Sequence, residues 1–174
     1  MILLSDYLIQ PKTKKAYGGR NMFDVFRNYY DEFLSALLEH IEISFIAIVT
    51  AIVLAIFVTI FLNFYKEFSH VTIYLFSLMY AIPSFALFAL LIPITGLGQT
   101  TAIIVLVIYD QYILVRTFLS GLSQVDKHVI EAAKAMGMTK WQILLKVQFP
   151  LAQKSFFAGL RLASTAIIAI ATIG

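Results

Sequence analysis

Residues 129–150 read VIEAAKAMGMTKWQILLKVQFP, and their local pattern predicts two short helices joined by a tight turn. Asp126, just before this stretch, can cap the first helix by accepting hydrogen bonds from its free backbone N–H groups. Gly137 can end that helix, because glycine adopts the left-handed conformation without a Cβ clash. Thr139 begins a T-x-x-Q sequence, the capping box that starts a new helix. We refer to residues 126–149 as the hairpin.

The second helix of the hairpin is expected to end near Phe149. The following residue, Pro150, displaces its predecessor from the helical region of backbone conformation. The hairpin lies between two strongly apolar blocks and carries Lys127, Lys134, Lys140 and Lys146. Cytoplasmic loops of membrane proteins are rich in Lys and Arg, so this charge pattern predicts a cytoplasmic position for the hairpin.

Composition places the chain in the membrane. It has 174 residues, of which 60% are hydrophobic and 13% charged, and its mean hydropathy is +0.86. Soluble domains carry about 25% charged residues. The net charge of +3 comes from the lysines in and near the hairpin. Nucleic-acid binding is not expected, because no aromatic and basic platform accompanies these lysines. The absence of cysteine excludes disulfides and thiolate sites.

Four apolar segments are predicted to cross the membrane, because roughly 20 residues span the ~30 Å hydrocarbon layer. They are residues 43–62, 71–95, 101–119 and 156–174. Residues 41–174 are therefore expected to form a transmembrane domain. Pro83 removes one helical hydrogen bond and is expected to kink or break the second segment. Ser84 is a candidate to satisfy the backbone groups that this break frees.

Residues 1–40 are predicted to precede the membrane domain. Residues 1–21 form a polar lead with lysines and glycines, and they do not resemble a signal peptide. Residues 22–39 alternate aromatic and charged side chains with helical spacing, which predicts an amphipathic helix. Such a helix can lie in the membrane interface. Packing on the outer surface of the protein itself explains the pattern equally well.

The hairpin sequence resembles the EAA stretch of permease subunits of ABC importers. EAA is followed after three residues by Gly137, and nine residues later by Val147, Phe149 and Pro150; the family usually has Ile and Leu where this chain has Val147 and Phe149. In that family the two short helices lie on the cytoplasmic face and dock into a groove of the ATPase subunit. The resemblance implies ATPase-coupling roles for Glu131, Ala132, Ala133, Gly137, Met138, Thr139 and Pro150. A plain linker between two spans is the alternative, and Glu131 can equally brace its own helix pair.

A narrower resemblance covers roughly residues 35–174. The segments HIEIS (40–44), AIPSFALFALLIPITGLG (81–98) and LVRTFLSGL (114–122) are similar to permeases for glycine betaine, carnitine and choline. This implies an all-α, polytopic transmembrane bundle of the five-helix type-I importer kind, whose last helix we expect to be missing from this sequence. Methionine permeases share the EAA stretch and are the alternative. A non-transporting membrane scaffold and a membrane enzyme are remote alternatives.

The resemblance also implies partners. They are an ABC ATPase subunit, a second permease subunit in a homo- or heterodimer, an extracellular binding protein or a binding domain fused beyond residue 174, and the lipid bilayer of the cell membrane. ATP is expected to bind the partner, since no G-x-x-x-x-G-K-[ST] loop occurs here. No catalytic residue, cofactor or metal is expected, because His128 and Glu131 lack further ligands nearby. With the hairpin cytoplasmic, counting back three spans places residues 63–70 inside and the N-terminus outside.

Asp110 departs from the family pattern, which has small or apolar residues at YDQY. A carboxylate near mid-membrane costs about 2.5–3.5 kcal/mol on insertion scales and normally faces protein or a water-filled path. With Tyr109 and Tyr112 beside it, it could attract a trimethylammonium group by charge and cation–π contact. We therefore expect Asp110, Tyr109, Tyr112, Pro83 and Ser84 along the translocation path. The alternative is that Asp110 pairs with a polar group of a neighbouring helix or subunit.

Overall fold

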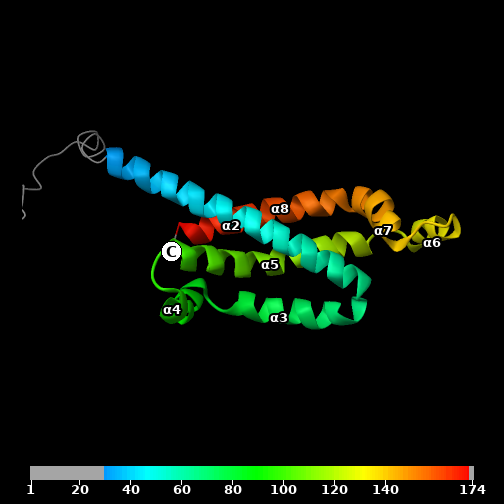
Figure 1. Ribbon diagram of the computed structural model, residues 1–174, viewed down its shortest axis with the longest axis horizontal. Helices are drawn as coiled ribbons and strands as arrows, with labels where there is room; N and C mark the ends of the chain where they lie inside the picture. Colours follow the sequence, from blue (N-terminus) through cyan, green and yellow to red (C-terminus); the bar gives the residue numbers. More distant parts are fainter. Residues whose placement is uncertain (1–29, 173–174) are drawn as a thin grey trace, which may run out of the picture. The chain divides into compact units, whose positions relative to one another are not determined.

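The computed structural model describes residues 30–172, and every regular element in this range is helical (Figure 1). The all-α prediction is thereby confirmed. The elements are α2 (Tyr30–Phe64), η1 (Lys66–Phe68), α3 (Ser69–Ala81), α4 (Ser84–Thr95), α5 (Gln99–Ser123), α6 (Lys127–Ala135), α7 (Lys140–Ile143), η2 (Leu144–Gln148) and α8 (Phe149–Ala171).

The chain divides into two compact units at residues 38 and 39, and the fold described below is that of residues 39–172. The predicted lead, residues 1–21, and most of the predicted amphipathic helix lie outside the described residues. The described part of that helix belongs to α2, which continues without a break to Phe64. Two separate helices were expected here. No glycine or proline interrupts residues 30–64, so nothing stops the helix between them.

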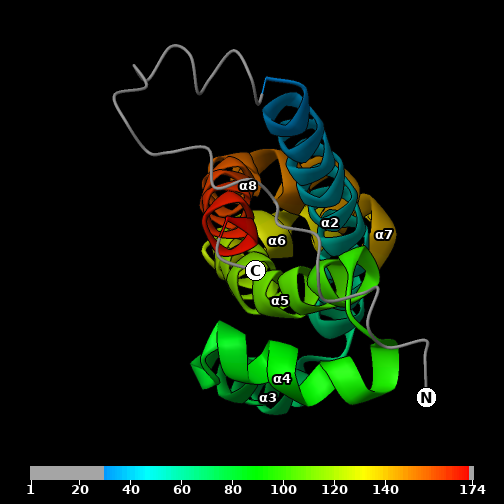
Figure 2. The same cartoon turned by 90° about the vertical axis from the view of Figure 1, so that its left-hand side faces the viewer.

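Three helices supply most of the apolar core. Viewed end-on in Figure 2, α2, α5 and α8 lie side by side, and α3 and α4 lie on one side of α5. The side of α2 that is buried carries mainly small residues, namely Ser44, Ala47, Ala51, Ala55, Thr59 and Leu62. Small side chains let helix backbones approach closely, which is the usual way that membrane helices pack.

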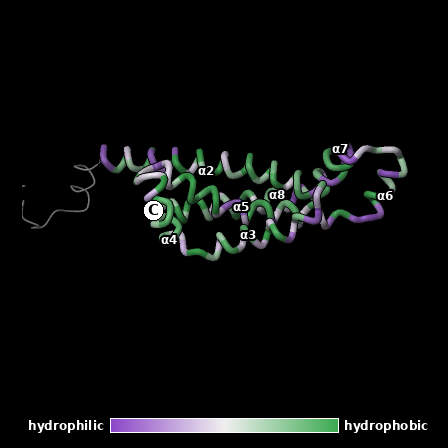
Figure 3. The backbone as a smooth tube through the Cα atoms, turned by 60° about the horizontal axis from the view of Figure 1, so that its bottom comes forward, coloured by the Kyte–Doolittle hydropathy of each residue, from purple (hydrophilic) through white to green (hydrophobic). Residues whose placement is uncertain are grey.

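The apolar segments agree with membrane crossing. Three helices, α2, α5 and the continuous stretch from α7 to α8, are long and apolar enough to span a membrane, and α3 with α4 makes a fourth if that bent pair counts as one span. Figure 3 shows hydrophobic residues along the bundle and hydrophilic residues gathered at the α6 end.

The segment predicted as one span, residues 71–95, is broken in the middle. Helices α3 and α4 meet at 96°, and Ile82 and Pro83 between them have extended backbones with ψ of 129° and 138°. Proline causes this break, as predicted. The Tyr109 hydroxyl, rather than that of Ser84, donates a hydrogen bond to the freed Ile82 carbonyl. The proposed role of Ser84 at the break is therefore wrong.

The predicted end of the second hairpin helix is also wrong. Phe149 keeps helical angles of −59° and −50°, and the chain runs from α7 through the π-helical η2 directly into α8. The Phe149 N–H bonds to the Leu144 carbonyl, five residues back. This wider turn relieves the crowding that proline imposes on a regular helix. Pro150 then occupies the first turn of α8, where a missing N–H costs little.

Candidate coupling and translocation site

The hairpin forms with the predicted caps. Asp126 accepts a hydrogen bond from the His128 N–H at 2.9 Å, and Gly137 takes the left-handed conformation with φ of 78°. Thr139 and Gln142 form both bonds of the capping box, at 2.8 and 3.3 Å. The two arms lie at one end of the helical bundle, beyond the ends of α5 and α8 (Figure 1). The caps and the turn of the hairpin thus follow from its local sequence.

The residues expected to contact an ATPase are not equally accessible. Glu131, Ala132, Gly137 and Thr139 are exposed, while Met138 is half-buried. Ala133 is only 2% exposed, and its carbonyl accepts the Met138 N–H at 3.1 Å. Ala133 therefore packs inside the hairpin. Pro150 is exposed but lies in α8 rather than in the hairpin.

Glu131 forms a contact within its own helix. Its Oε2 lies 3.8 Å from His128 Nδ1, and both side chains are largely exposed. Exposed ion pairs contribute little to stability. Within residues 30–172, no group of three or more His, Cys, Asp or Glu side chains is arranged to hold a metal. Glu131 thus remains available to a partner.

Sequence reasoning missed two exposed apolar residues of the hairpin. Met136, at the turn between its arms, is 74% exposed, and Trp141, in the second arm, is 54% exposed. A large apolar residue in a polar turn is the signal that could have indicated Met136. Trp141 also packs against Phe64 at the end of α2, with ring centroids 4.8 Å apart.

The hairpin is joined firmly to the bundle. The Asn63 Nδ2 donates to the Gln148 Oε1 at 3.4 Å. An apolar cluster at the base of the hairpin contains side chains from the end of α2, the end of α5, both arms of the hairpin and the start of α8. Its members are Leu122, Val125, Leu144 and Ala152, with Ile60, Phe64, Ile130 and Phe156 packed against them. The hairpin therefore packs against three long helices, α2, α5 and α8.

Helices α5 and α8 approach closely at two glycines. A Cβ added at Gly121 would lie 2.5 Å from the Ser155 Cβ, and one added at Gly159 would lie 3.1 Å from the Thr117 Cγ2. The side of α5 that carries Thr117 and Gly121 therefore faces α8. Asp110 precedes these residues by about two and three helical turns, so it shares that side.

Asp110 is only 1% exposed, and neither of its carboxylate oxygens has a hydrogen-bond partner among residues 30–172. The next residue, Gln111, turns toward α2 and donates from Nε2 to the Ala51 carbonyl at 3.1 Å. A buried carboxylate without a partner is costly in a membrane and is usually retained for function. The alternative pairing of Asp110 with a neighbouring helix is not seen within the described residues.

The structure does not bring Asp110 together with its two neighbouring tyrosines. Tyr109 packs against Tyr80 at 5.6 Å between ring centroids, on the side of the α3–α4 break. Tyr112 lies 5.0 Å from the same Tyr80 ring and accepts a hydrogen bond from Arg116. Pro83 and Ser84 belong to the Tyr109 side. The expected site residues thus form an aromatic group on one side of α5 and a carboxylate on another.

The sequence is similar to those of known transport proteins. Residues 47–174 match the family model described as "Binding-protein-dependent transport system inner membrane component". The carnitine transport permease protein OpuCB of Listeria monocytogenes is 35% identical over 135 residues, which cover 78% of this chain and 62% of that protein. The choline transport system permease protein OpuBB of Bacillus subtilis (strain 168) is 31% identical over 142 residues, which cover 82% and 65%.

A third relative is of a different kind. The ergothioneine transport permease/ergothioneine binding protein EgtU of Helicobacter pylori (strain G27) is 41% identical over 96 residues, covering 55% of this chain and 17% of that protein. The chain spans less than two thirds of the length of each of these three relatives. The family model, by contrast, covers most of the chain, including the hairpin. The chain belongs to the family of binding-protein-dependent transport system inner membrane components.

Proposed function

We propose that the chain is the membrane-spanning subunit of an ATP-driven importer that carries small quaternary amines. The observation that carries this proposal is the capped hairpin, which stands beyond the bundle yet packs on three long helices. The names of the relatives support the substrate class, since carnitine and choline both carry a trimethylammonium group. Amine carriers are preferred to methionine carriers on this ground.

The proposed partners follow from the shape of the hairpin. Its tip offers one large apolar side chain, Met136, and its first arm carries the exposed carboxylate of Glu131. An exposed apolar residue with a polar rim is typical of a protein docking surface. We infer that an ATPase subunit receives this tip. The family description supports an extracellular binding protein, either separate or fused, and a second permease subunit, identical or different, is expected to complete the path.

The proposed orientation places the hairpin in the cytoplasm. The α2–α3 turn lies at the same end, because Phe64 and Lys66 line a cavity together with Lys134 and Lys140 of the hairpin. The hairpin is basic, which suits the cytoplasmic side. The start of the first predicted span, at residue 43, is then on the outer side.

The proposed mechanism is alternating access. Closure of the ATPases moves the hairpin, and the apolar cluster at its base passes that motion to α2, α5 and α8 as a rigid-body rotation. The extended residues Ile82 and Pro83 give α3 and α4 a place to bend. No ATP site is needed in this subunit.

The proposed path uses both groups of polar residues on α5. Tyr80, Tyr109 and Tyr112 present aromatic faces that attract a trimethylammonium group. Asp110 is the anionic member, on the side of α5 that faces α8. An unpartnered buried carboxylate supports this assignment, since burial without function would be a net cost.

Uptake by proteoliposomes tests the proposed function. The complete transporter, with its ATPase and binding protein, is reconstituted with ATP, and uptake of labelled glycine betaine, choline, carnitine and methionine is compared. We expect ATP-dependent uptake of at least one amine and none of methionine above the ATP-free level. Uptake of methionine alone would reject the substrate class, and ATP-independent uptake of all four would reject the importer mechanism.

A further inference from the structure

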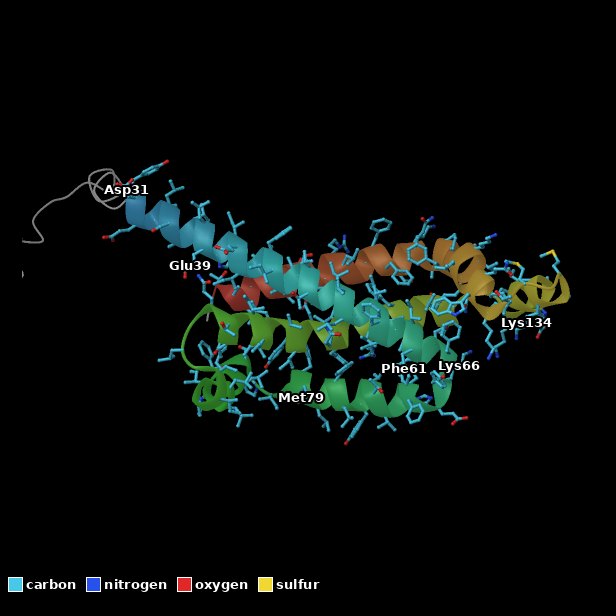
Figure 4. The ribbon with its side chains drawn as sticks, viewed as in Figure 1. Asp31, Glu39, Phe61, Lys66, Met79 and Lys134 are labelled. Carbon is cyan, nitrogen blue, oxygen red and sulfur yellow. The ribbon has the colours of Figure 1, made fainter. Side chains whose placement is uncertain are left out.

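Two adjoining cavities open between the α2–α3 turn and the hairpin. One has a volume of 440 Å³ and is lined by the turn and by both arms of the hairpin. The other has a volume of 580 Å³ and reaches along α3 and the end of α5. Both are lined by Asn63, Lys66, Ile130 and Gln148, so they adjoin at these residues, and we refer to the two together as the crevice. Figure 4 shows Lys66 at the turn and Lys134 on the hairpin, at the same end of the bundle.

The crevice is strongly basic. Its walls carry five cationic side chains and a single carboxylate, Glu67; the cations are Lys66, Arg116, Lys127, Lys134 and Lys140. Within residues 30–172, none of these five lies within ion-pair distance of a carboxylate. Asn63, Ser69, Ser120 and Ser123 add neutral hydrogen-bonding groups to the same walls. Such a surface is suited to a phosphate group, which accepts several charge-assisted hydrogen bonds.

The crevice lies where the apolar helices end. It opens where α2 ends at Phe64, α3 begins at Ser69 and α5 ends at Ser123. Exposed aromatic residues lie in or beside it: Tyr65 and Phe68 line the first cavity, and the Phe61 ring packs against both of theirs. Trp141 packs against Phe64, which also lines that cavity. Belts of Trp and Tyr mark the boundary between membrane and water. The occupant is therefore expected to come from the membrane surface.

We propose that this basic crevice binds the phosphate headgroup of an anionic lipid. Basic pockets between membrane helices on the cytoplasmic side bind such headgroups in other proteins. Lys146 and Lys154 line neither cavity, so they provide a matched control for the loss of positive charge. The bound headgroup would bridge the α2–α3 turn and the first arm of the hairpin. Of this proposal, only the assignment of the site to the cytoplasmic leaflet rests on the proposed function.

Retention of lipid by the purified transporter tests this proposal. The complex is measured by native mass spectrometry after equilibration with equal amounts of phosphatidylglycerol and phosphatidylcholine. The crevice variant is Lys66→Gln with Lys127→Gln, and the matched control, Lys146→Gln with Lys154→Gln, removes the same charge outside the crevice. We expect the parent and the control variant to retain phosphatidylglycerol in preference to phosphatidylcholine. The crevice variant should retain at least fivefold less phosphatidylglycerol than the parent. Lys66→Arg with Lys127→Arg should restore retention.

Competition with inorganic phosphate identifies the ligand. Inorganic phosphate at the same concentration should displace little phosphatidylglycerol, because it lacks the acyl chains. Equal loss from the crevice and control variants, or no loss from either, would overturn the proposal. Displacement by inorganic phosphate alone would identify a soluble anion as the ligand and overturn the assignment to lipid. Uptake activity is measured separately, so failure of the lipid site and failure of the proposed transport function are distinguishable.

Discussion

The Asn63 side chain of α2 hydrogen-bonds to the Gln148 side chain at the base of the hairpin, 85 positions further along the chain. This bond and the contact of Phe64 with Trp141 join the end of the first long helix to the second arm of the hairpin. The two segments should therefore move as one body during transport.

Cross-linking tests whether they do. The chain contains no cysteine, so Asn63→Cys with Gln148→Cys supplies the only pair of thiols in it. We expect a short bis-methanethiosulfonate linker between them to leave amine uptake within about twofold of the untreated double variant. The single-cysteine variants, treated in the same way, are the controls. Loss of uptake on cross-linking that a reducing agent restores would show that the two segments must separate.

Removing the aromatic contact should uncouple hydrolysis from transport. Trp141→Ala eliminates the interaction with Phe64, and aromatic pairs contribute about 0.5–1.5 kcal/mol beyond their buried area. We expect ATP hydrolysis to persist while the amount of amine carried per ATP falls severalfold, measured together in proteoliposomes. Trp141→Phe keeps a ring and should preserve most of the ratio. An unchanged ratio in Trp141→Ala would argue against a coupling role.

The close approach of α5 and α8 makes Gly121 sensitive to size. A Cβ there would lie 2.5 Å from the Ser155 Cβ. We expect Gly121→Ala to lower the free energy of unfolding by about 1–3 kcal/mol, the usual cost of overpacking. Adding Ser155→Gly removes the atom in conflict and should recover part of the loss. Thermal unfolding in detergent measures both variants, and equal stability of Gly121→Ala and the parent would contradict the described packing.

Gly137 should tolerate asparagine better than alanine. Its φ of 78° is left-handed, and the space around a Cβ there is open, so the cost of substitution is conformational rather than steric. The left-handed conformation costs about 1–2 kcal/mol for most residues, but Asn adopts it more readily. We expect Gly137→Ala to weaken binding of the ATPase subunit several-fold more than Gly137→Asn, as measured by titration. Equal affinities would indicate that the turn geometry does not matter for docking.

Substitution of Asp110 tests whether this residue lies on the proposed translocation path. Asn has the same shape without the charge, so Asp110→Asn should reduce uptake of cationic choline more than uptake of zwitterionic glycine betaine. We expect the ratio of the two rates to change by at least threefold. Equal effects on both substrates would leave Asp110 a structural residue of the α5–α8 contact.

Features that depend on neighbouring residues can be predicted from this sequence, whereas contacts between distant segments cannot. The caps at Asp126 and Thr139 and the turn at Gly137 depend on neighbouring residues, and they are confirmed. The effect of Pro150 was mispredicted, because a π-helical turn before it accommodates the ring without ending the helix. The hydrogen bond between Asn63 and Gln148 has no local signal.

The predicted translocation path also depended on contacts between helices that the local sequence does not reveal. YDQY was interpreted as one binding group because its residues are adjacent in sequence. Helical geometry turns successive residues by about 100°, so adjacent side chains face different neighbours. Tyr109 accordingly contacts the α3–α4 break, and Gln111 contacts α2. Only the packing of the helices reveals which side each residue occupies.

Site-specific photocross-linking most directly tests whether the hairpin receives the ATPase. A photoreactive amino acid replaces Met136 at the tip of the hairpin, and in the matched control it replaces Leu97, an 87% exposed residue in the turn between α4 and α5. The assembled transporter is irradiated and analysed for covalent adducts. We predict an adduct with the ATPase subunit from position 136 and none from position 97. An ATPase adduct from position 97, or none from position 136, would contradict the account.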